Sequence, residues 1–193
     1  MTVKQRMTAE DLWEMPEVPG KRFELVRGEL VEVPGAGGEH GFLALWVGAL
    51  LLRFVMERDL GVVCGDSTSY VLHYDPDVVR IPDVSFVAKA RVPETGVPVG
   101  FWPFASDLAV EIVSPTDRAE DVHGKVLEYL EAGTRLVWVL WPRDRRVTVY
   151  TSAEAAYELG ADGVLDGGEV LPGFRAIVSE MFGALGQAAS HRD

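Results

Sequence analysis

Apolar and polar positions alternate in short runs near the start of the chain. The segment Thr8–Met15 predicts a short helix, because its first residue can cap the N-terminus and Asp11 stands three positions later. Two strand-like runs follow, Arg22–Val26 and Glu29–Val33, separated by two residues of which one is Gly28. A two-residue connection that contains glycine is typical of a tight turn, so we predict a β-hairpin here.

Three longer segments predict helices. His40–Arg58 is largely apolar with its large side chains at helical spacing, which indicates a mostly buried helix. A second helix is predicted over Asp117–Glu131, with Thr116 as its N-cap and Gly133 beyond its end. A terminal helix is expected near Val178–Gln187.

Further strand-like runs fill most of the remaining chain. They are Val62–Cys64, Ser69–Tyr74, Val84–Ala88, Leu108–Val113, Arg135–Trp141 and Val147–Tyr150. Strand clusters interrupted by two main helices indicate an α/β fold with a mixed central sheet flanked by helices. With 193 residues and no internal repeat or linker, we expect a single domain over residues 1–193.

Composition narrows the class of protein. The chain has 18 basic and 30 acidic residues, a net charge of −12, which argues against a nucleic-acid-coating protein but allows contact at a local patch. The one cysteine, Cys64, excludes an intrachain disulfide and a cysteine-based zinc site. No secretory signal pattern is visible, and the apolar run Phe42–Leu52 is shorter than the about 20 residues of a membrane-spanning helix. We expect a cytoplasmic protein without a membrane partner.

Several familiar site motifs are incomplete. The glycine-rich loop Pro34–Glu39 lies between a predicted strand and a predicted helix, but His40 stands where a dinucleotide-binding loop needs glycine or alanine. None of the 4 histidines is paired at a zinc-ligand spacing, although His40 could line a site at the start of its helix. Cys64 lies in a run typical of a packed thiol, and no serine has a G-x-S-x-G frame.

Two carboxylates stand out because apolar strand residues surround them. Asp83 directly precedes Val84–Ala88, and Glu111 lies inside Leu108–Val113. Period-two alternation puts apolar neighbours on the same face as Glu111. A buried carboxylate is costly unless it is paired or binds a cation. The alternative is that Glu111 faces a solvated side of the sheet.

Four other polar residues are less decisive. Lys125 lies on the predicted helix after this strand, with Asp121 one turn before it and Tyr129 one turn after it. Asp121 and Lys125 have the spacing of an ordinary surface ion pair, which is the simpler interpretation of these two residues. Glu24 alternates with apolar residues of its strand, which by itself predicts an exposed side chain.

One ordered set of segments lies within residues 8–175. It comprises Phe23–Leu30, His40, Pro82–Val84, Val110–Pro115, Asp121 with Lys125, Tyr129, Ala132–Gly133 and Val137–Pro142. This set resembles the Uma-two family of restriction endonucleases, which belongs to the PD-(D/E)XK nuclease superfamily. The resemblance implies a restriction-endonuclease-like fold, in which helices flank a mixed central sheet.

The resemblance also implies catalytic roles. Asp83 and Glu111 match the two acids of the motif, and Glu24 matches an N-terminal acid near the same site. The wider superfamily carries its lysine two residues after the second acid, but that position is Val113 here. Lys125, which matches a lysine on the following helix, must therefore reach the site from that helix.

A metal site is implied as well. Asp83, Glu111 and the backbone carbonyl of Ile112 would bind Mg²⁺, for which Mn²⁺ would substitute. Mg²⁺ suits such a site because it binds through one or two carboxylates, waters and substrate phosphates. His40, Asp121 and Tyr129 are expected to line the site.

Three functions share these residues. The first is a Mg²⁺-dependent endonuclease that hydrolyses DNA phosphodiester bonds. The second is a non-catalytic binding or regulatory module with a nuclease fold, which the net charge favours. The third is a metal-dependent phosphodiesterase that acts on another substrate. The filled acidic and lysine positions favour the first function over the second.

The expected partners are DNA and a second copy of the chain. Basic residues that could contact DNA occur in two places: Lys21, Arg22 and Arg27, and Arg143, Arg145 and Arg146. Symmetric dimers often cleave both DNA strands, and two-fold dimers are the commonest oligomers, so we expect a homodimer. The aromatic residues of the segment 101–104 could cover the core or form a dimer contact.

Overall fold

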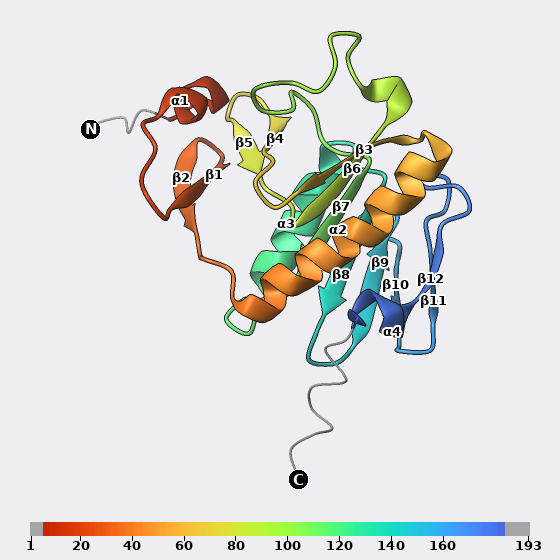
Figure 1. Cartoon of the computed structure of the whole chain (residues 1–193). Helices are drawn as coiled ribbons and strands as arrows, with labels where there is room; N and C mark the ends of the chain where they lie inside the picture. Colours follow the sequence, from red (N-terminus) through yellow and green to blue (C-terminus); the bar gives the residue numbers. More distant parts are fainter. Residues whose placement is uncertain (1–5, 184–193) are drawn as a thin grey trace.

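A six-stranded sheet forms the centre of the computed structural model, which describes residues 6–183 (Figure 1). The strand order is β10-β9-β8-β7-β6-β3. The strands are β3 (Gly61–Gly65), β6 (Val84–Ala88), β7 (Leu108–Ile112), β8 (Leu136–Trp141), β9 (Arg146–Tyr150) and β10 (Ala156–Leu159). β7 and β8 run parallel, whereas the other neighbouring strands of this sheet run antiparallel. The sheet is therefore mixed, as predicted.

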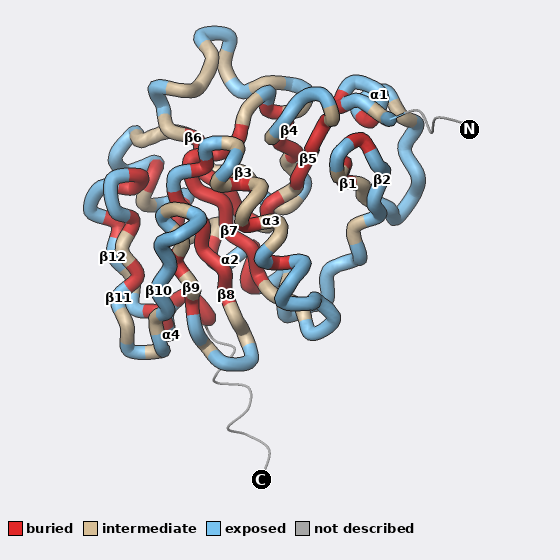
Figure 2. Tube along the Cα trace, turned by 180° about the vertical axis from the view of Figure 1, so that it is seen from behind, coloured by how far each residue is buried: buried red, intermediate tan, exposed pale blue. Residues whose placement is uncertain are grey.

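Helices cover both faces of this sheet. α2 (Gly38–Arg58) crosses one face, and α3 (Ala119–Glu131) lies against the other (Figure 1). Alternate strand residues pack against each helix, so Val110 and Trp138 join the core on the α2 side, whereas Ala109 and Val137 join that on the α3 side. The central strands are buried along most of their length (Figure 2).

A second, four-stranded sheet lies beside the first, with the strand order β2-β1-β5-β4. Its strands are β1 (Arg22–Val26), β2 (Glu29–Val33), β4 (Tyr70–His73) and β5 (Val78–Arg80). The predicted hairpin is confirmed, and Arg27 and Gly28 have φ angles of 54° and 77°, as a type I′ turn requires. α1 (Ala9–Glu14) packs on this sheet, and Thr8 and Asp11 form the predicted capping box.

One local prediction is wrong, and one strand was not predicted. Thr116 does not cap α3, because the Asp117 carboxylate accepts the Ser114 N–H at 2.7 Å and forms a turn before the helix. α3 begins at Ala119, with Arg118 at the N-cap position. β5 was not predicted, because three residues between two prolines are too few to show a period.

Short elements complete the fold. They are η1 (Lys89–Arg91), β11 (Val164–Asp166), β12 (Arg175–Ile177) and α4 (Val178–Met181). The terminal helix predicted near Val178–Gln187 begins with α4, and residues 184–187 lie outside the described part of the chain. In the aromatic segment, Trp102 is 1% exposed and stacks on Tyr70, so this side chain covers the core.

Candidate active site

The junction between the two sheets brings together charged residues from four elements. β5 ends at Arg80 and β6 begins at Val84, so a three-residue link carries the chain from the smaller sheet to the larger one. Glu24 of β1, Glu111 of β7 and Lys125 of α3 line one cavity of about 600 Å³ at this junction. Residues far apart in the sequence therefore share one polar site.

Asp83 and Glu111 lie on neighbouring strand ends. Val84 is paired with Val110, and the Asp83 N–H donates to the Val110 carbonyl at 3.0 Å, so Asp83 lies beside the end of β7 that carries Glu111. Oδ2 of Asp83 accepts the Ile112 N–H at 2.7 Å. Nε2 of His40, from the first turn of α2, lies 3.2 Å from the same oxygen. Two neighbours thus hold one oxygen of Asp83.

The backbone of Ile112 faces this carboxylate. In a β-strand, the N–H and the C=O of one residue point to the same side of the strand. Because the Ile112 N–H donates to Asp83, the Ile112 carbonyl is directed to the same edge of β7. This direction is the one that a backbone metal ligand beside Asp83 requires.

Glu111 is buried on the α3 side of the sheet. The Tyr129 hydroxyl donates to its Oε1 at 2.7 Å, and Nζ of Lys125 lies 3.6 Å from its Oε2. Burial raises the pKa of Glu111 to about 7; Lys125 opposes this shift and the charge of Asp83 adds to it. The carboxylate is therefore short of positive charge even with the lysine beside it.

Lys125 reaches the site from α3, as the resemblance implied. Its Nζ lies 3.4 Å from Oε1 of Glu24, in addition to its contact with Glu111. Burial would lower the pKa of Lys125, but Glu111 and Glu24 outweigh burial and raise it, so the amine stays charged. The surface ion pair with Asp121 is wrong, because Lys125 pairs with these two acids and Asp121 is exposed on the cavity wall.

Glu24 is 2% exposed, so the prediction of an exposed strand residue is wrong. Arg80 covers it, with Nη1 donating to Oε2 of Glu24 at 2.7 Å, and the Ile81 N–H donates to Oε1 at 3.0 Å. Burial alone would raise the pKa of Glu24, but Lys125, Arg80 and this N–H together lower it. Glu24 is therefore a stable carboxylate beside the lysine.

Sequence reasoning missed Arg80 and Glu128. Nε of Arg80 donates to Oε2 of Glu128 at 2.6 Å, while its Nη1 binds Glu24, so the guanidinium bridges two acids. Arg80 is 8% exposed. A basic residue in the apolar run Val78–Ile81 was the available signal, because a buried cation needs paired acids.

The donor set fits a hard divalent cation that keeps part of its water shell. No group of three or more His, Cys, Asp or Glu side chains within residues 6–183 is arranged as a metal site. Asp83, Glu111 and the Ile112 carbonyl supply two carboxylates and one carbonyl, which suits Mg²⁺ with waters and phosphate oxygens as its other ligands. The raised pKa of Glu111 agrees with a missing positive charge.

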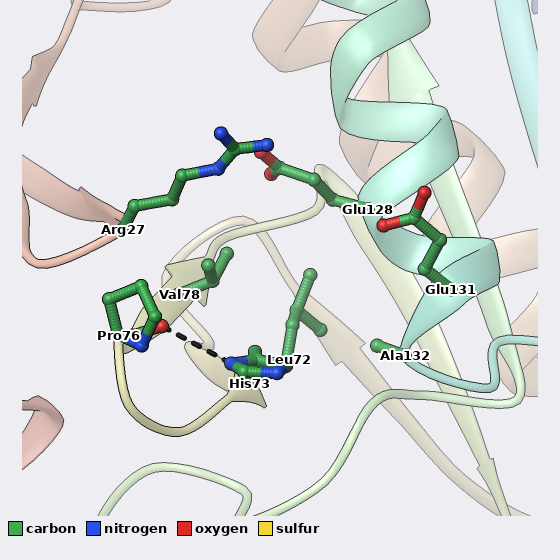
Figure 3. Close-up of a pocket in the computed structure, with 8 residues that line it drawn as sticks. All are labelled: Arg27, Leu72, His73, Pro76, Val78, Glu128, Glu131 and Ala132. Carbon is green, nitrogen blue, oxygen red and sulfur yellow. Dashed lines mark hydrogen bonds between the residues drawn. The ribbon is translucent and has the colours of Figure 1, made fainter.

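A second hollow lies on the other side of Glu128 (Figure 3). It has a volume of about 240 Å³ and is bordered by the β1–β2 turn, the β4–β5 connection and the end of α3. Arg27 points toward Glu128 across it, and Nδ1 of His73 lies 3.3 Å from the Pro76 carbonyl oxygen. Glu111 and Lys125 line the cavity at the sheet junction and not this hollow, so that cavity is the better candidate. Asp83 lines neither of the two.

Comparisons with known proteins agree with this architecture. A family model described as "Uma2: Putative restriction endonuclease" matches residues 9–180. A crystal structure of a "putative nuclease belonging to DUF820" from Anabaena variabilis ATCC 29413 is similar, with a TM-score of 0.80 and 20% identity. The match covers 91% of this chain and 97% of that one, and confirms the predicted fold. No curated protein matches the sequence.

Proposed function

The chain belongs to the Uma2 family, and we propose that it is a metal-dependent endonuclease that hydrolyses DNA phosphodiester bonds at the sheet junction. The observation that carries this proposal is the placement of Lys125. Its amine lies 3.4 Å from Glu24 and 3.6 Å from Glu111, and Asp83 accepts the N–H of Ile112, the residue after Glu111. A cation whose side chain is only 25% exposed, beside two acids, suits chemistry on a phosphate better than a solvated surface does.

Each residue of the cluster has a role in this proposal. Asp83, Glu111 and the Ile112 carbonyl would hold Mg²⁺, which when bound lowers the pKa of water and offsets charge on a phosphate. Lys125 stays protonated and would neutralise the negative charge that develops on the phosphate. Glu24 holds the Lys125 amine, and the Tyr129 hydroxyl holds one oxygen of Glu111.

A non-catalytic binding module is the second candidate. Seven acidic side chains and three basic ones line the cavity, which disfavours a polyanion in the absence of divalent cations. A phosphodiesterase for another substrate would use the same groups. The three functions differ in which substrates are cleaved.

The test is a cleavage panel on the purified chain with Mg²⁺ or Mn²⁺. The substrates are supercoiled plasmid, single-stranded DNA, RNA and a small chromogenic phosphodiester. We expect plasmid cleavage that falls by about 100-fold or more in Asp83→Asn, Glu111→Gln and Lys125→Met. Asp121→Asn is the matched control, because this acid lines the same cavity outside the cluster.

Three results would contradict the proposal. Full DNA cleavage by all three cluster variants would place the chemistry elsewhere. Cleavage of the small phosphodiester alone, lost in the same variants, would assign the site to a different substrate class. Absence of any cleavage by a folded, metal-loaded chain would favour the binding module.

A further inference from the structure

The outer face of α2 carries a row of exposed apolar side chains. We name it the outer stripe; its members are Phe42, Leu45, Trp46, Leu52 and Met56, which are 38%, 75%, 39%, 44% and 71% exposed. Of the 15 large apolar side chains that are exposed within residues 6–183, these five lie on one helix. Figure 1 shows α2 across the front of the sheet with no other element in front of it.

A groove runs along this face. It has a volume of about 300 Å³, and Leu45 and Leu52 of α2 line it together with Val63 of β3. Two acids, Asp66 and Asp83, line it as well. β3 is the last strand of the six-stranded sheet, so no described strand pairs with its outer edge. The groove and the outer stripe share Leu45 and Leu52, and the lining of the groove is apolar apart from Asp66 and Asp83.

We propose that this surface is the contact between two copies of the chain, in which the two α2 helices pack antiparallel about Ala49. Phe42 and Trp46 lie on one side of Ala49, and Leu52 and Met56 lie at matching distances on the other. A two-fold axis at Ala49 would therefore bring the aromatic half of each stripe onto the aliphatic half of its copy, as an isologous interface requires.

The centre of the stripe suits close packing of two helices. Gly48 and Ala49 are the small residues at this point, and packed helices approach to about 8–10 Å depending on the side chains between them.

The apolar area is of the size that a dimer uses. If a large side chain presents roughly 200 Å², the exposed fractions of the stripe amount to on the order of 500 Å². This value is near the upper limit of about 300–600 Å² for the largest patch on a monomer. A stable interface covers about 800 Å² on each partner, and the groove and the β3 edge supply further surface.

A second copy fits this surface better than a membrane does. By length and composition alone α2 could cross a bilayer, but Leu43, Val47, Leu51 and Val55 on its inner face are fully buried in the core. Only one face is free. A helix that lies on a membrane carries basic residues on its polar face, whereas the net charge here is −12.

Sedimentation equilibrium of the full chain tests the interface without reference to catalysis. We expect a monomer–dimer equilibrium that Leu45→Glu weakens on the order of 100-fold, because the charge would be buried at the contact. Val99→Glu is the matched control, since Val99 is 95% exposed and lies outside α2. Circular dichroism verifies that both variants fold. A monomer at all concentrations, or a dimer that survives Leu45→Glu, overturns the proposal.

Crosslinking tests the antiparallel geometry. In a Cys64→Ala background, Ala49→Cys would face its own copy across the two-fold axis and form an intermolecular disulfide under mild oxidation. Val99→Cys serves as the control for random collision. Equal crosslinking of the two variants contradicts the geometry. Flotation of the wild-type chain with phosphatidylcholine vesicles, lost in Leu45→Glu, would assign the surface to a membrane and overturn the proposal.

Discussion

At the sheet junction, the pKa of each buried acid depends on which charged or polar atoms lie next to it. Glu24 has Arg80 and Lys125 as partners, and its pKa lies below the usual value. Glu111 has a hydroxyl at 2.7 Å and an amine only at 3.6 Å, and burial raises its pKa to about 7. The negative charge of Glu24 is therefore neutralised by its neighbours, whereas that of Glu111 is not. Glu111 is the acid that a bound cation would stabilise.

The raised pKa of Glu111 predicts a pH-dependent stability of the metal-free protein. The ordinary value is 4.5 and the folded value about 7, so in this window the folded chain retains a proton that the unfolded chain releases. Below pH 4.5 Glu111 is protonated in both states and its ionisation does not affect stability. As the pH rises to about 7, the cost of ionising the buried carboxyl lowers the free energy of unfolding by at most about 3 kcal/mol. Glu111→Gln removes this cost.

Urea unfolding in EDTA, at about pH 5 and about pH 8, measures this effect. We expect Glu111→Gln to gain stability relative to the wild type as the pH rises, because the amide cannot ionise. Subtracting the two proteins cancels the other titrating groups. An equal difference at the two pH values would mean that Glu111 ionises in the folded protein as freely as in the unfolded chain.

Arg80 is predicted to matter more for stability than its place on a short strand suggests. Arg80→Gln leaves Glu24 and Glu128 without their bridging cation, at an expected cost of about 3–5 kcal/mol. The matched control is Arg175→Gln, whose pair with Asp166 is exposed and contributes less than about 1 kcal/mol. Chemical denaturation of both variants tests this; similar losses would contradict a buried bridge.

α3 directs the Lys125 side chain into the site, because the rotation of this helix about its axis decides which residues face the sheet. Val122, Val126 and Tyr129 are buried on the sheet, and this face sets the rotation of the helix. Lys125 and Tyr129 are one turn apart, so both side chains reach Glu111. The start of α3 depends on the turn in which Asp117 accepts the Ser114 N–H, and not on an N-cap at Thr116.

This difference between two threonines can be measured. Thr8→Ala removes a side chain that accepts the Asp11 N–H at 3.1 Å and should lower the free energy of unfolding by about 1 kcal/mol. Thr116→Ala should change it by less than about 0.5 kcal/mol, because Thr116 caps no helix. Thermal unfolding distinguishes the two variants. A larger loss of unfolding free energy in Thr116→Ala than in Thr8→Ala would indicate that Thr116 caps α3 after all.

The local sequence patterns predicted the helices and strands that carry the site better than they predicted which side chains contact one another. Asp83 and Glu111 were found because a carboxylate among apolar strand residues is a local signal. The burial of Glu24 was not predictable in this way, because Arg80 covers it from β5 and the pairing of β1 with β5 joins distant segments. The position of Lys125 came from the family resemblance, since its local spacing suggested a pair with Asp121.

At the scale of the whole molecule, acidic side chains outnumber basic ones also at the surface where DNA would bind. Three predicted basic residues pair with acids: Lys21 with Glu32 at 2.6 Å, Arg22 with Asp66 at 3.3 Å, and Arg146 with Glu158. Seven acidic and three basic side chains line the cavity. Affinity for DNA must then depend strongly on divalent cations, because phosphate contacts dominate nucleic-acid binding.

Binding of a DNA duplex to Lys125→Met, which we expect to be inactive, measures this dependence. At constant ionic strength, replacing Na⁺ by Mg²⁺ should tighten binding by about tenfold or more, because the cation offsets the acidic cavity. Fluorescence anisotropy reports the affinity. Equal binding in the two salts would show that DNA is held away from the acidic cluster, or without help from a metal.

The most direct measurement is a calorimetric titration of the wild-type chain with Mn²⁺, beside Asp83→Asn and Asp121→Asn. The proposed site predicts saturable binding that is lost in Asp83→Asn and kept in Asp121→Asn. The reason is that Asp83 is held at the Ile112 N–H beside Glu111, whereas Asp121 is exposed on the cavity wall. Equal Mn²⁺ binding by all three proteins would contradict a metal site at Asp83 and, with it, the proposed endonuclease.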